Sequence, residues 1–446
     1  MVSGPNAEAR MAHTDAAPET GQPHHHSTGT RAPEAGAVSA CPHSPTEAAS
    51  PAGGQPGQEP GSKLTFITLL YVAALTITSL YAPQPLLSSI HTDYPALGKP
   101  TVALLMAVCM LPLSIAPLVY GFYLRTLQTR MVLVVGVCML IVADLGLFVC
   151  THFWGLVALR LLQGLSIPAL LTCLMASISN HYKGAELQRA MAIYIAVTIL
   201  GGVVGRLAMG IVASWLGWRH AFLAASLALI LALVPLWLLP ARGNSRHMSH
   251  VRFGDFFVIM RTPGMLKLLG IESCVMFLYG AISNYLPFHL SGAEQGVSEW
   301  RIALMYTGNM LGVFIALGSH WIIARFGSET RVIGAGLCII LAGLPILFCA
   351  NLWIIFAAMC VVSVGQFLIH GICPGLINRL KSADKGAVNG VYLSCYYAGS
   401  AIGAYGPGFV YAQWGWGVLV SMLMGILLLM GLACTHRLGE SISRGM

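Results

Sequence analysis

The chain has 446 residues, of which only 9% are charged and 56% are hydrophobic, and its formal net charge is +8. A soluble domain carries about a quarter of charged residues, so this composition excludes an ordinary soluble protein. The basic excess does not indicate a nucleic-acid partner, because the Lys and Arg residues lie in short loops between apolar segments and no nucleic-acid-binding motif accompanies them.

Residues 1–62 are rich in Pro, Gly, Ala, Ser, Thr and His and contain almost no large aliphatic residues. This composition predicts a disordered tail. The three His at 24–26 either bind a metal weakly or belong to a solvated tail without ligand geometry. All cysteines except Cys41 lie in or beside apolar segments and none forms a CxxC pair, so we expect no metal site and no cofactor.

Twelve apolar stretches follow between residues 64 and 435, separated by charges and turn residues. About 20 apolar residues cross a bilayer as a helix, and continuous apolar runs exclude the alternating pattern of a membrane β-barrel. The sequence therefore predicts an all-α membrane protein with twelve transmembrane helices. The expected spans are 64–90, 101–123, 131–150, 154–180, 188–214, 218–240, 265–290, 301–323, 331–350, 352–377, 386–410 and 414–435.

The loop charges indicate how these spans are oriented. With the N-terminus on the cytoplasmic side, the outer loops hold three basic residues: Lys99, Arg219 and Arg301. The inner loops and the C-terminal tail hold fifteen: Arg125, Arg130, Lys183, Arg189, Arg242, Arg246, Arg252, Arg261, Arg325, Arg331, Arg379, Lys381, Lys385, Arg437 and Arg444. Since cytoplasmic loops carry the excess of Lys and Arg, both termini are predicted to be cytoplasmic.

The two halves of the chain share a short internal sequence repeat. Arg125, Gly136 and Cys138 recur 200 positions later as Arg325, Gly336 and Cys338. Such an internal repeat predicts two six-helix bundles, as in transporters that work by alternating access. The expected parts are a tail (1–62), a first bundle (63–240), a cytoplasmic linker (241–264), a second bundle (265–435) and a C-terminal tail (436–446).

Two motifs in the first half carry a resemblance to a known family. The stretch RLLQGLSIPALL at 160–171, with Arg160, Gln163 and Gly164, is similar to the RxxQG motif of the major facilitator superfamily. The stretch GGVVGRLAMG at 201–210 resembles the glycine-rich antiporter motif of the drug-efflux branches, through the glycines Gly201, Gly205 and Gly210. Arg206 stands where that motif has proline. The stretch SLYAPQPLL at 79–87 looks most like the corresponding sequence of the YnfM-type efflux branch.

The loop between the second and third spans departs from the family pattern. The family's motif reads roughly GxLaDRxGRR, whereas this chain has GFYLRTLQTR from Gly121 to Arg130, with Arg125 at the acidic position. The second-half copy keeps Arg325 and Gly327 but has Ala324 in place of the acid. The resemblance ties this motif to locking the cytoplasmic gate, so the missing acid removes one partner of that lock. Altered gating is one interpretation, loss of transport is another, and whether gating changes is left open.

Ionisable side chains at membrane depth are costly and are functional candidates for that reason. Asp144 and Arg160 each lie eight residues from the turn near 152, which places both about 12 Å from it along their helices. They could form a buried ion pair that only holds the structure together, or a carboxylate whose protonation is coupled to transport through Arg160.

Three further ionisable side chains at membrane depth each have two possible roles. Glu272 could bind a proton during transport or be neutralised by Lys267. Arg206 lies on a glycine-rich face and could contact substrate or proton, or pair with a carbonyl or an acid. His370 could relay protons or be a hydrogen-bonded core residue. With Asp144 and Arg160, these are the predicted proton-coupling residues.

Polar groups that interrupt apolar faces are the predicted lining of a substrate cavity, although such stripes are as often packing surfaces. They are Tyr81, Gln84, Gln163, Asn284, Asn309, Asn389, Tyr392 and Tyr396. The spacing of Asn389, Tyr392 and Tyr396 places these three on one face of a helix. Walls with few charges suit a moderately apolar substrate, either cationic or neutral.

These patterns predict a secondary active transporter that exports a drug-like or metabolite solute by antiport with protons. Uptake by proton symport and a transport-inactive sensor or scaffold are the alternatives. An enzyme is not expected, because HExxH, GxSxG and Walker sequences are absent. The expected partners are a small-molecule substrate, protons and the lipid bilayer, and the protein is expected to act as a monomer in the plasma membrane, the inner membrane of a bacterium.

Overall fold

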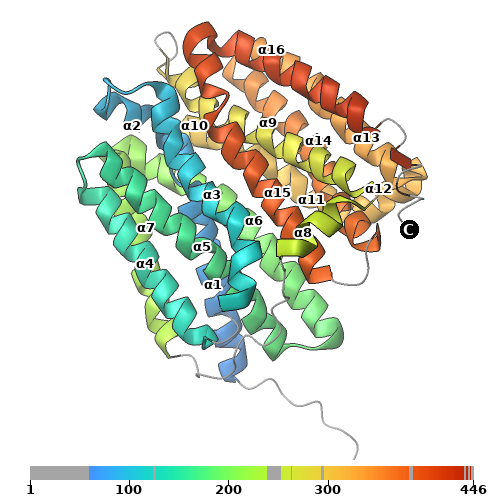
Figure 1. The fold of residues 1–446 in the computed structure, drawn as a ribbon. Helices are drawn as coiled ribbons and strands as arrows, with labels where there is room; N and C mark the ends of the chain where they lie inside the picture. The colour runs from blue at the N-terminus through green and yellow to red at the C-terminus, as the bar shows by residue number, and fades with distance from the viewer. Residues whose placement is uncertain are drawn as a thin grey trace, which may run out of the picture. The chain divides into compact units, whose positions relative to one another are not determined.

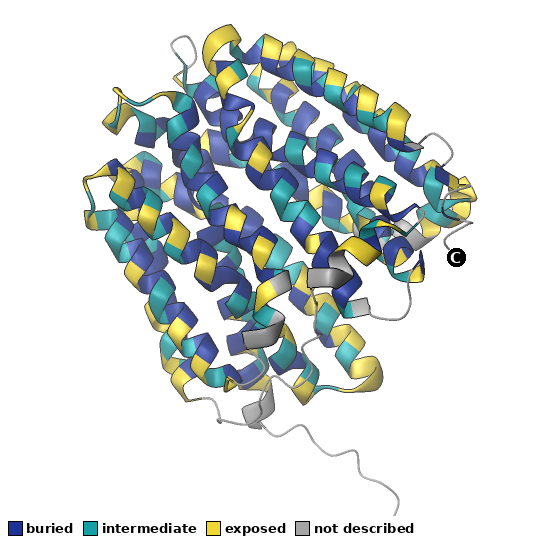
Figure 2. Ribbon diagram, in the orientation of Figure 1, coloured by how far each residue is buried: buried dark blue, intermediate teal, exposed yellow. Residues whose placement is uncertain are grey.

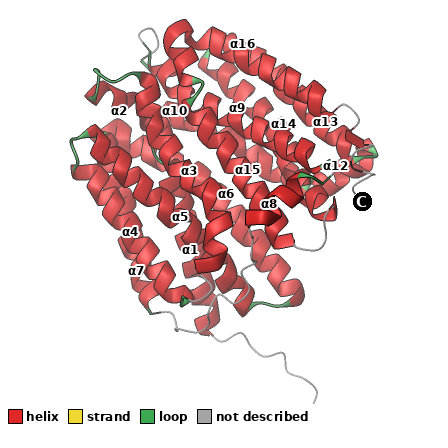
Figure 3. Ribbon diagram, viewed as in Figure 1, coloured by secondary structure: helices red, strands yellow, loops and turns green. Residues whose placement is uncertain are grey.

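The computed structural model describes residues 60–123, 127–238, 253–262, 264–292, 296–380, 385–435, 438–439 and 442. This part of the chain is built of helices, and no β-strand occurs within it (Figures 1 and 3). Residues 58–446 form one compact unit. Residues 1–59 of the predicted tail, most of the predicted linker and most of the C-terminal tail lie outside the described residues, whereas residues 60–62 already belong to the first helix. The division into two bundles at 241–264 stays a prediction.

The first half contains seven α-helices and one 3₁₀ turn among its described residues. They are α1 (Pro60–Tyr81), η1 (Gln84–Leu86), α2 (Leu87–Asp93), α3 (Lys99–Tyr123), α4 (Thr129–Val149), α5 (Phe153–His181), α6 (Gly184–Leu216) and α7 (Trp218–Trp237). Helix α1 packs on α6, α4 packs on both α5 and α7, and α3 packs on α5.

The second half follows after the short helix α8 (Phe253–Met260). Its elements are α9 (Met265–Ser291), α10 (Glu299–Met305), η2 (Tyr306–Asn309), α11 (Met310–Leu317), α12 (Ser319–Phe326), α13 (Glu329–Gly343), η3 (Leu344–Phe348), α14 (Leu352–Leu380), α15 (Lys385–Tyr405) and α16 (Gly408–Thr435). Within this half α13 packs on α14 and α9 packs on α15 and α16, while α3–α15 and α6–α10 contacts join the two halves.

Ten segments among the described residues are helical, long and apolar enough to cross a membrane, against twelve predicted spans. Two predicted spans are not among the ten. The segment predicted at 301–323 is divided into α10, η2, α11 and α12, and the segment predicted at 386–410 forms the more polar helix α15. By helix length and hydropathy, ten of the twelve predicted spans are therefore found among the described residues.

The junction of the last two spans differs from the prediction. Helix α15 ends at Tyr405, five residues before the expected end at 410, and Pro407 lies two residues after that end. Proline lacks the N–H that a continuing helix needs, which explains the early end. Helix α16 then begins at Gly408 but bends at Gly415, whose φ of 78° is open mainly to glycine.

Buried and exposed residues are distributed as in a membrane protein (Figure 2). Large apolar side chains such as Leu231, Leu429 and Val149 are exposed on the outside of the helices. Exposed Trp residues lie at or near helix ends, as Trp215 in α6 and Trp237 in α7 do. Apolar faces with Trp at their ends are the pattern expected of helices in contact with lipid and its interfaces.

Below, the end of the molecule where α1 begins and α16 ends is called the terminal end, and the other is called the opposite end. The turns between α2 and α3, between α4 and α5 and between α9 and α10 lie at the opposite end.

Candidate functional site

The interior contains three clusters of polar side chains, and the first surrounds Arg160 in α5. Its guanidinium is fully buried and donates from Nη1 to the Ser79 carbonyl (2.8 Å), from Nη2 to the Leu80 carbonyl (2.8 Å) and from Nε to the Leu105 carbonyl (3.0 Å). The Ser79 carbonyl is available because its helical donor would be residue 83, which is a proline. The carbonyl oxygen that the break after α1 leaves without a helical donor therefore accepts a hydrogen bond from the buried Arg160 guanidinium.

Asp144 and Arg160 lie in the same cluster, as their depths predict, but they do not touch. Gln163 lies between them, because its Oε1 accepts from Arg160 Nη1 and its Nε2 donates to Asp144 Oδ1 at 2.6 Å. The alternative of a direct ion pair is thus wrong, since position along a helix fixes depth and leaves the direction of a side chain open. Gln163 is fully buried and bonded on both sides, in place of its predicted exposure to a cavity.

The second cluster joins three helices of the second half around Glu272. Its Oε1 lies 2.8 Å from Nδ1 of His370 in α14, and the same nitrogen lies 2.7 Å from the hydroxyl of Tyr392 in α15. The Glu272 side chain is 0% exposed, whereas that of His370 is 33% exposed. The cluster therefore connects a buried carboxyl to a partly exposed histidine.

The ring of Tyr396 continues this cluster, with its centroid 5.1 Å from that of His370. Asn389, one turn before Tyr392, accepts instead from Asn378 Nδ2 at 2.8 Å. The helix face predicted from the spacing of Asn389, Tyr392 and Tyr396 thus contacts α14 in the described part of the chain.

The third cluster lies around Arg206 in α6, a side chain that is 3% exposed. Nη1 donates to the Gly202 carbonyl and Nε donates to Gln84 Oε1, both at 2.7 Å. The guanidinium also lies 4.0 Å from the ring centre of Tyr81 and 5.2 Å from that of Tyr306, distances at which a cation and an aromatic ring attract. In the described residues no carboxylate lies within 4.0 Å of it.

This third cluster crosses from one half of the chain to the other. Gln84 Nε2 donates to Asn284 Oδ1 in α9 (3.1 Å), and the contact with Tyr306 reaches η2. Nearby, Asn309 donates to the Tyr279 hydroxyl and accepts from Ser363 at 2.6 Å. Gln84, Asn284 and Asn309 are all buried, so they are hydrogen-bonded core groups in this conformation.

The three motif glycines allow helices to approach closely. A Cβ at Gly201 would lie 2.7 Å from the Ala74 backbone, and one at Gly205 would lie 2.3 Å from Thr78 Oγ1, both on α1. A Cβ at Gly210 would lie 2.6 Å from Ala303 Cβ on α10, in the other half. This confirms the close packing that the glycine-rich face predicts, within the first half and across the halves.

The predicted gating loops are described in part. Arg125 lies outside the described residues, as do the surroundings of Gly121. Arg130 donates to the Trp237 carbonyl at the end of α7. In the second-half copy Arg325 is exposed, and Gly327 ends α12 with a φ of 75°. Two residues later, Glu329 pairs with Arg379 at the end of α14, an ion pair that the comparison with the family motif did not predict.

Glu299, at the start of α10, was missed by the sequence prediction. Its Oε1 accepts from Ser89 Oγ of α2 at 2.5 Å, and its Oε2 lies 3.1 Å from Ser214 Oγ of α6. It joins second-half α10 to two first-half elements at the opposite end. The only signal in the sequence is that few acids border a span, and Glu299 is one of them.

The helical bundle and its buried charges define a multi-pass membrane transporter. The Major Facilitator Superfamily model matches residues 64–404, and the chain belongs to this family. This confirms the family resemblance based on the RxxQG-like and glycine-rich motifs. The protein is a transporter and not an enzyme.

The curated relatives are distant but cover most of the chain. The inner membrane transport protein YnfM of Escherichia coli is 24% identical over 83% of this chain and 90% of its own length. The MFS-type transporter YybF of Bacillus subtilis is also 24% identical, over 81% of this chain and 91% of its own. The chloramphenicol resistance protein of Pseudomonas aeruginosa is 24% identical over 84% and 94%.

Solved structures show the same fold. A peptide transporter POT in complex with sulfate superposes with a TM-score of 0.72 at 13% identity, covering 85% of this chain and 95% of the other. Another structure of that transporter, in complex with alafosfalin, gives a TM-score of 0.71 at 14% identity, covering 86% and 95%. At such identities the likeness concerns the fold alone.

Proposed function

We propose that this protein is a proton-coupled transporter that exports small molecules by alternating access, with Glu272 as the proton-binding group. The observation that carries the proposal is the Glu272–His370–Tyr392 cluster, which joins α9, α14 and α15 through contacts of 2.7–2.8 Å. It combines a fully buried carboxyl with a partly exposed imidazole, a group that can both accept and donate a proton.

The cluster supports coupling because a proton changes the contacts between its helices. With Glu272 ionised, a donor on His370 holds the carboxylate, and the pair ties α9 to α14. A proton that enters through His370 and stays on Glu272 removes the negative charge and weakens this tie. Proton binding then favours one conformation, and substrate can favour the other, which is the requirement for coupled transport.

The contacts between the halves support alternating access. The hydrogen bonds from Gln84 to Asn284 and from Ser89 to Glu299 join the halves on the side toward the opposite end. We assign this conformation to the state that is closed at the opposite end. In the other state these bonds break while the halves approach at the terminal end.

The remaining parts of the proposal come from the sequence and the relatives. Twelve spans in two bundles, cytoplasmic termini and an inner-membrane location agree with the loop charges and with the printed name of YnfM. Export of a drug-like solute is supported by the relative named a chloramphenicol resistance protein. The protein is proposed to work as a monomer.

Proteoliposomes with an imposed pH gradient test the proposal, with radiolabelled chloramphenicol as the first probe and other solutes from a toxicity screen after it. We expect flux opposite to the proton gradient that collapses when the gradient is dissipated. Glu272→Gln removes the carboxyl proposed to bind the proton and is expected to abolish the dependence on the gradient. Asp93→Asn, the same loss of charge at an exposed site, is the matched control. Flux along the proton gradient would indicate symport, and gradient-dependent flux in Glu272→Gln would refute the role of Glu272.

A further inference from the structure

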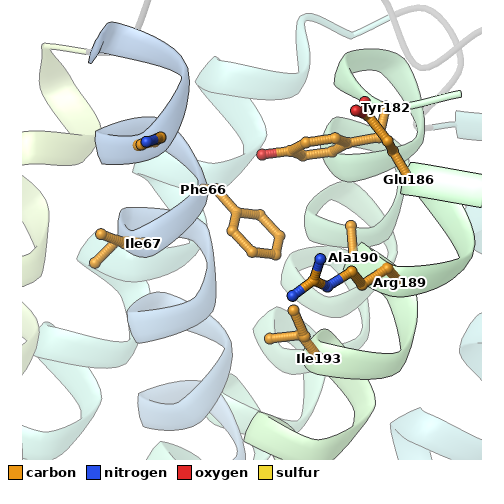
Figure 4. A pocket seen from close by; sticks show the side chains of 8 residues that line it. Phe66, Ile67, Tyr182, Glu186, Arg189, Ala190 and Ile193 are labelled. Atoms are coloured by element: carbon orange, nitrogen blue, oxygen red, sulfur yellow. The ribbon is translucent and has the colours of Figure 1, made fainter. Parts of the chain in front are cut away.

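A cavity of about 410 Å³ lies between α1 and α6 at the terminal end, away from the three polar clusters. Figure 4 shows its lining, with the Phe66 ring of α1 between the Tyr182 ring and the side chain of Arg189. The rings of Phe66 and Tyr182 meet edge to face at 5.3 Å and form one wall.

The charged part of the lining favours an anion. Lys63 on α1 and Arg189 on α6 border the cavity and are exposed, and among the described residues no carboxylate lies within 4.0 Å of either. Arg189 extends from α6 toward α1 (Figure 4). Glu186 is the only acid of the lining, so two positive charges face one negative charge.

The apolar part of the lining continues into the lipid-facing surface. Ile193 begins an exposed stripe along α6 that continues with Leu200, Val204 and Ile211, at helical spacing. Ile67 on α1 is 61% exposed. Exposed aliphatic faces of a membrane protein contact acyl chains, so the cavity opens toward lipid and has its charges at the membrane surface.

We propose that this cavity binds one acidic phospholipid, with its phosphate against Lys63 and Arg189 and an acyl chain along Ile67 and Ile193. A basic pocket between membrane helices on the cytoplasmic side is suited to an anionic head group. The inner leaflet as the source of the lipid depends on the cytoplasmic orientation proposed above. Lipid binding itself does not depend on proton coupling, and its test reads no flux.

Native mass spectrometry of the purified full-length protein tests the site, with phosphatidylglycerol titrated against phosphatidylcholine of the same acyl chains. We expect one phosphatidylglycerol to bind in preference to phosphatidylcholine. Each cation near a membrane surface contributes about a fivefold gain, so Lys63→Gln with Arg189→Gln is expected to weaken binding about 30-fold. Lys183→Gln is the matched control, because Lys183 is exposed at the same end and outside the lining.

A gain of affinity separates the site from misfolding. Glu186→Gln removes the single acid and is expected to tighten phosphatidylglycerol binding about fivefold, which a damaged protein cannot do. Inorganic phosphate in the same titration separates the two sources of the anion, and its displacement of the lipid would assign the site to a soluble phosphate. Equal binding of the two lipids, or unchanged binding by the doubly substituted protein, would overturn the proposal.

Discussion

Glu272 and His370 share one hydrogen bond across α9 and α14, and their side chains meet at 2.8 Å. Residues that act through a shared contact have non-additive effects when they are substituted. We expect Glu272→Gln and His370→Gln each to lower gradient-driven flux by about 100-fold or more, since a positioned proton-transfer group typically contributes about 100- to 10,000-fold. The double substitution is expected to cost no more than the more severe single one.

The measurement is the initial rate of uptake into proteoliposomes at a fixed pH gradient. Exchange of labelled for unlabelled substrate without a gradient is the control, because it needs the binding site but no net proton movement. Losses that multiply in the double variant would show that the two residues act separately.

Gln163 is a second residue whose role can be tested, since it bonds to both Arg160 and Asp144. Gln163→Leu keeps much of the side-chain volume but leaves two buried charged groups each without one hydrogen bond. A hydrogen bond to a charged group contributes about 1.5–3 kcal/mol, so we expect this variant to be less stable by about 3 kcal/mol. Thermal unfolding in detergent measures the loss, and Gln128→Leu on the surface serves as the control.

Asp144→Asn in the Gln163→Leu background refines this prediction. Without its charge, residue 144 costs less when it is left unpaired in the interior. The double variant is therefore expected to regain part of the lost stability. A further loss on adding Asp144→Asn would contradict the bridge as the origin of the effect.

At the scale of elements, α6 contacts its own half through Gly205 and the other half through Gly210. A methyl group at Gly205 meets Thr78 of α1, a contact within the first half, so Gly205→Ala is expected to lower stability by about 1–3 kcal/mol. A side chain at Gly210 meets Ala303 and the Glu299 carbonyl across the halves. Gly210→Val is expected to disfavour closure at the opposite end while it leaves thermal stability nearly unchanged.

Spin labels at Thr92 and Arg301, both exposed at the opposite end, measure that closure by their distance distribution. We expect the population with the longer distance to grow in Gly210→Val and to stay unchanged in Gly205→Ala. Equal distributions in both variants would refute the division of α6 into two contact surfaces.

The elements also show what the sequence can predict. Hydropathy located the spans because burial in lipid demands about 20 apolar residues wherever a helix crosses, and ten such helices are present among the described residues. It did not locate the break within 301–323, because η2 forms where Tyr306 and Asn309 bond to other helices, and those contacts leave no local pattern. Glu272 and His370 are 98 residues apart, so their contact depends on packing and leaves no local pattern.

For the whole molecule, the bias of fifteen basic residues against three predicts that the terminal end faces the cytoplasm. Two positions test this orientation in intact cells with a membrane-impermeant maleimide. Cys349, which is exposed in the turn between η3 and α14, lies at the opposite end and is expected to react without permeabilisation. A cysteine introduced at Lys183, between α5 and α6, in a Cys349→Ser background is expected to react only after the membrane is opened. The reverse pattern would show that the terminal end faces the outside. The Lys63–Arg189 cavity would then lie in the outer leaflet, and the hydrogen bonds of Glu299 would lie on the cytoplasmic side.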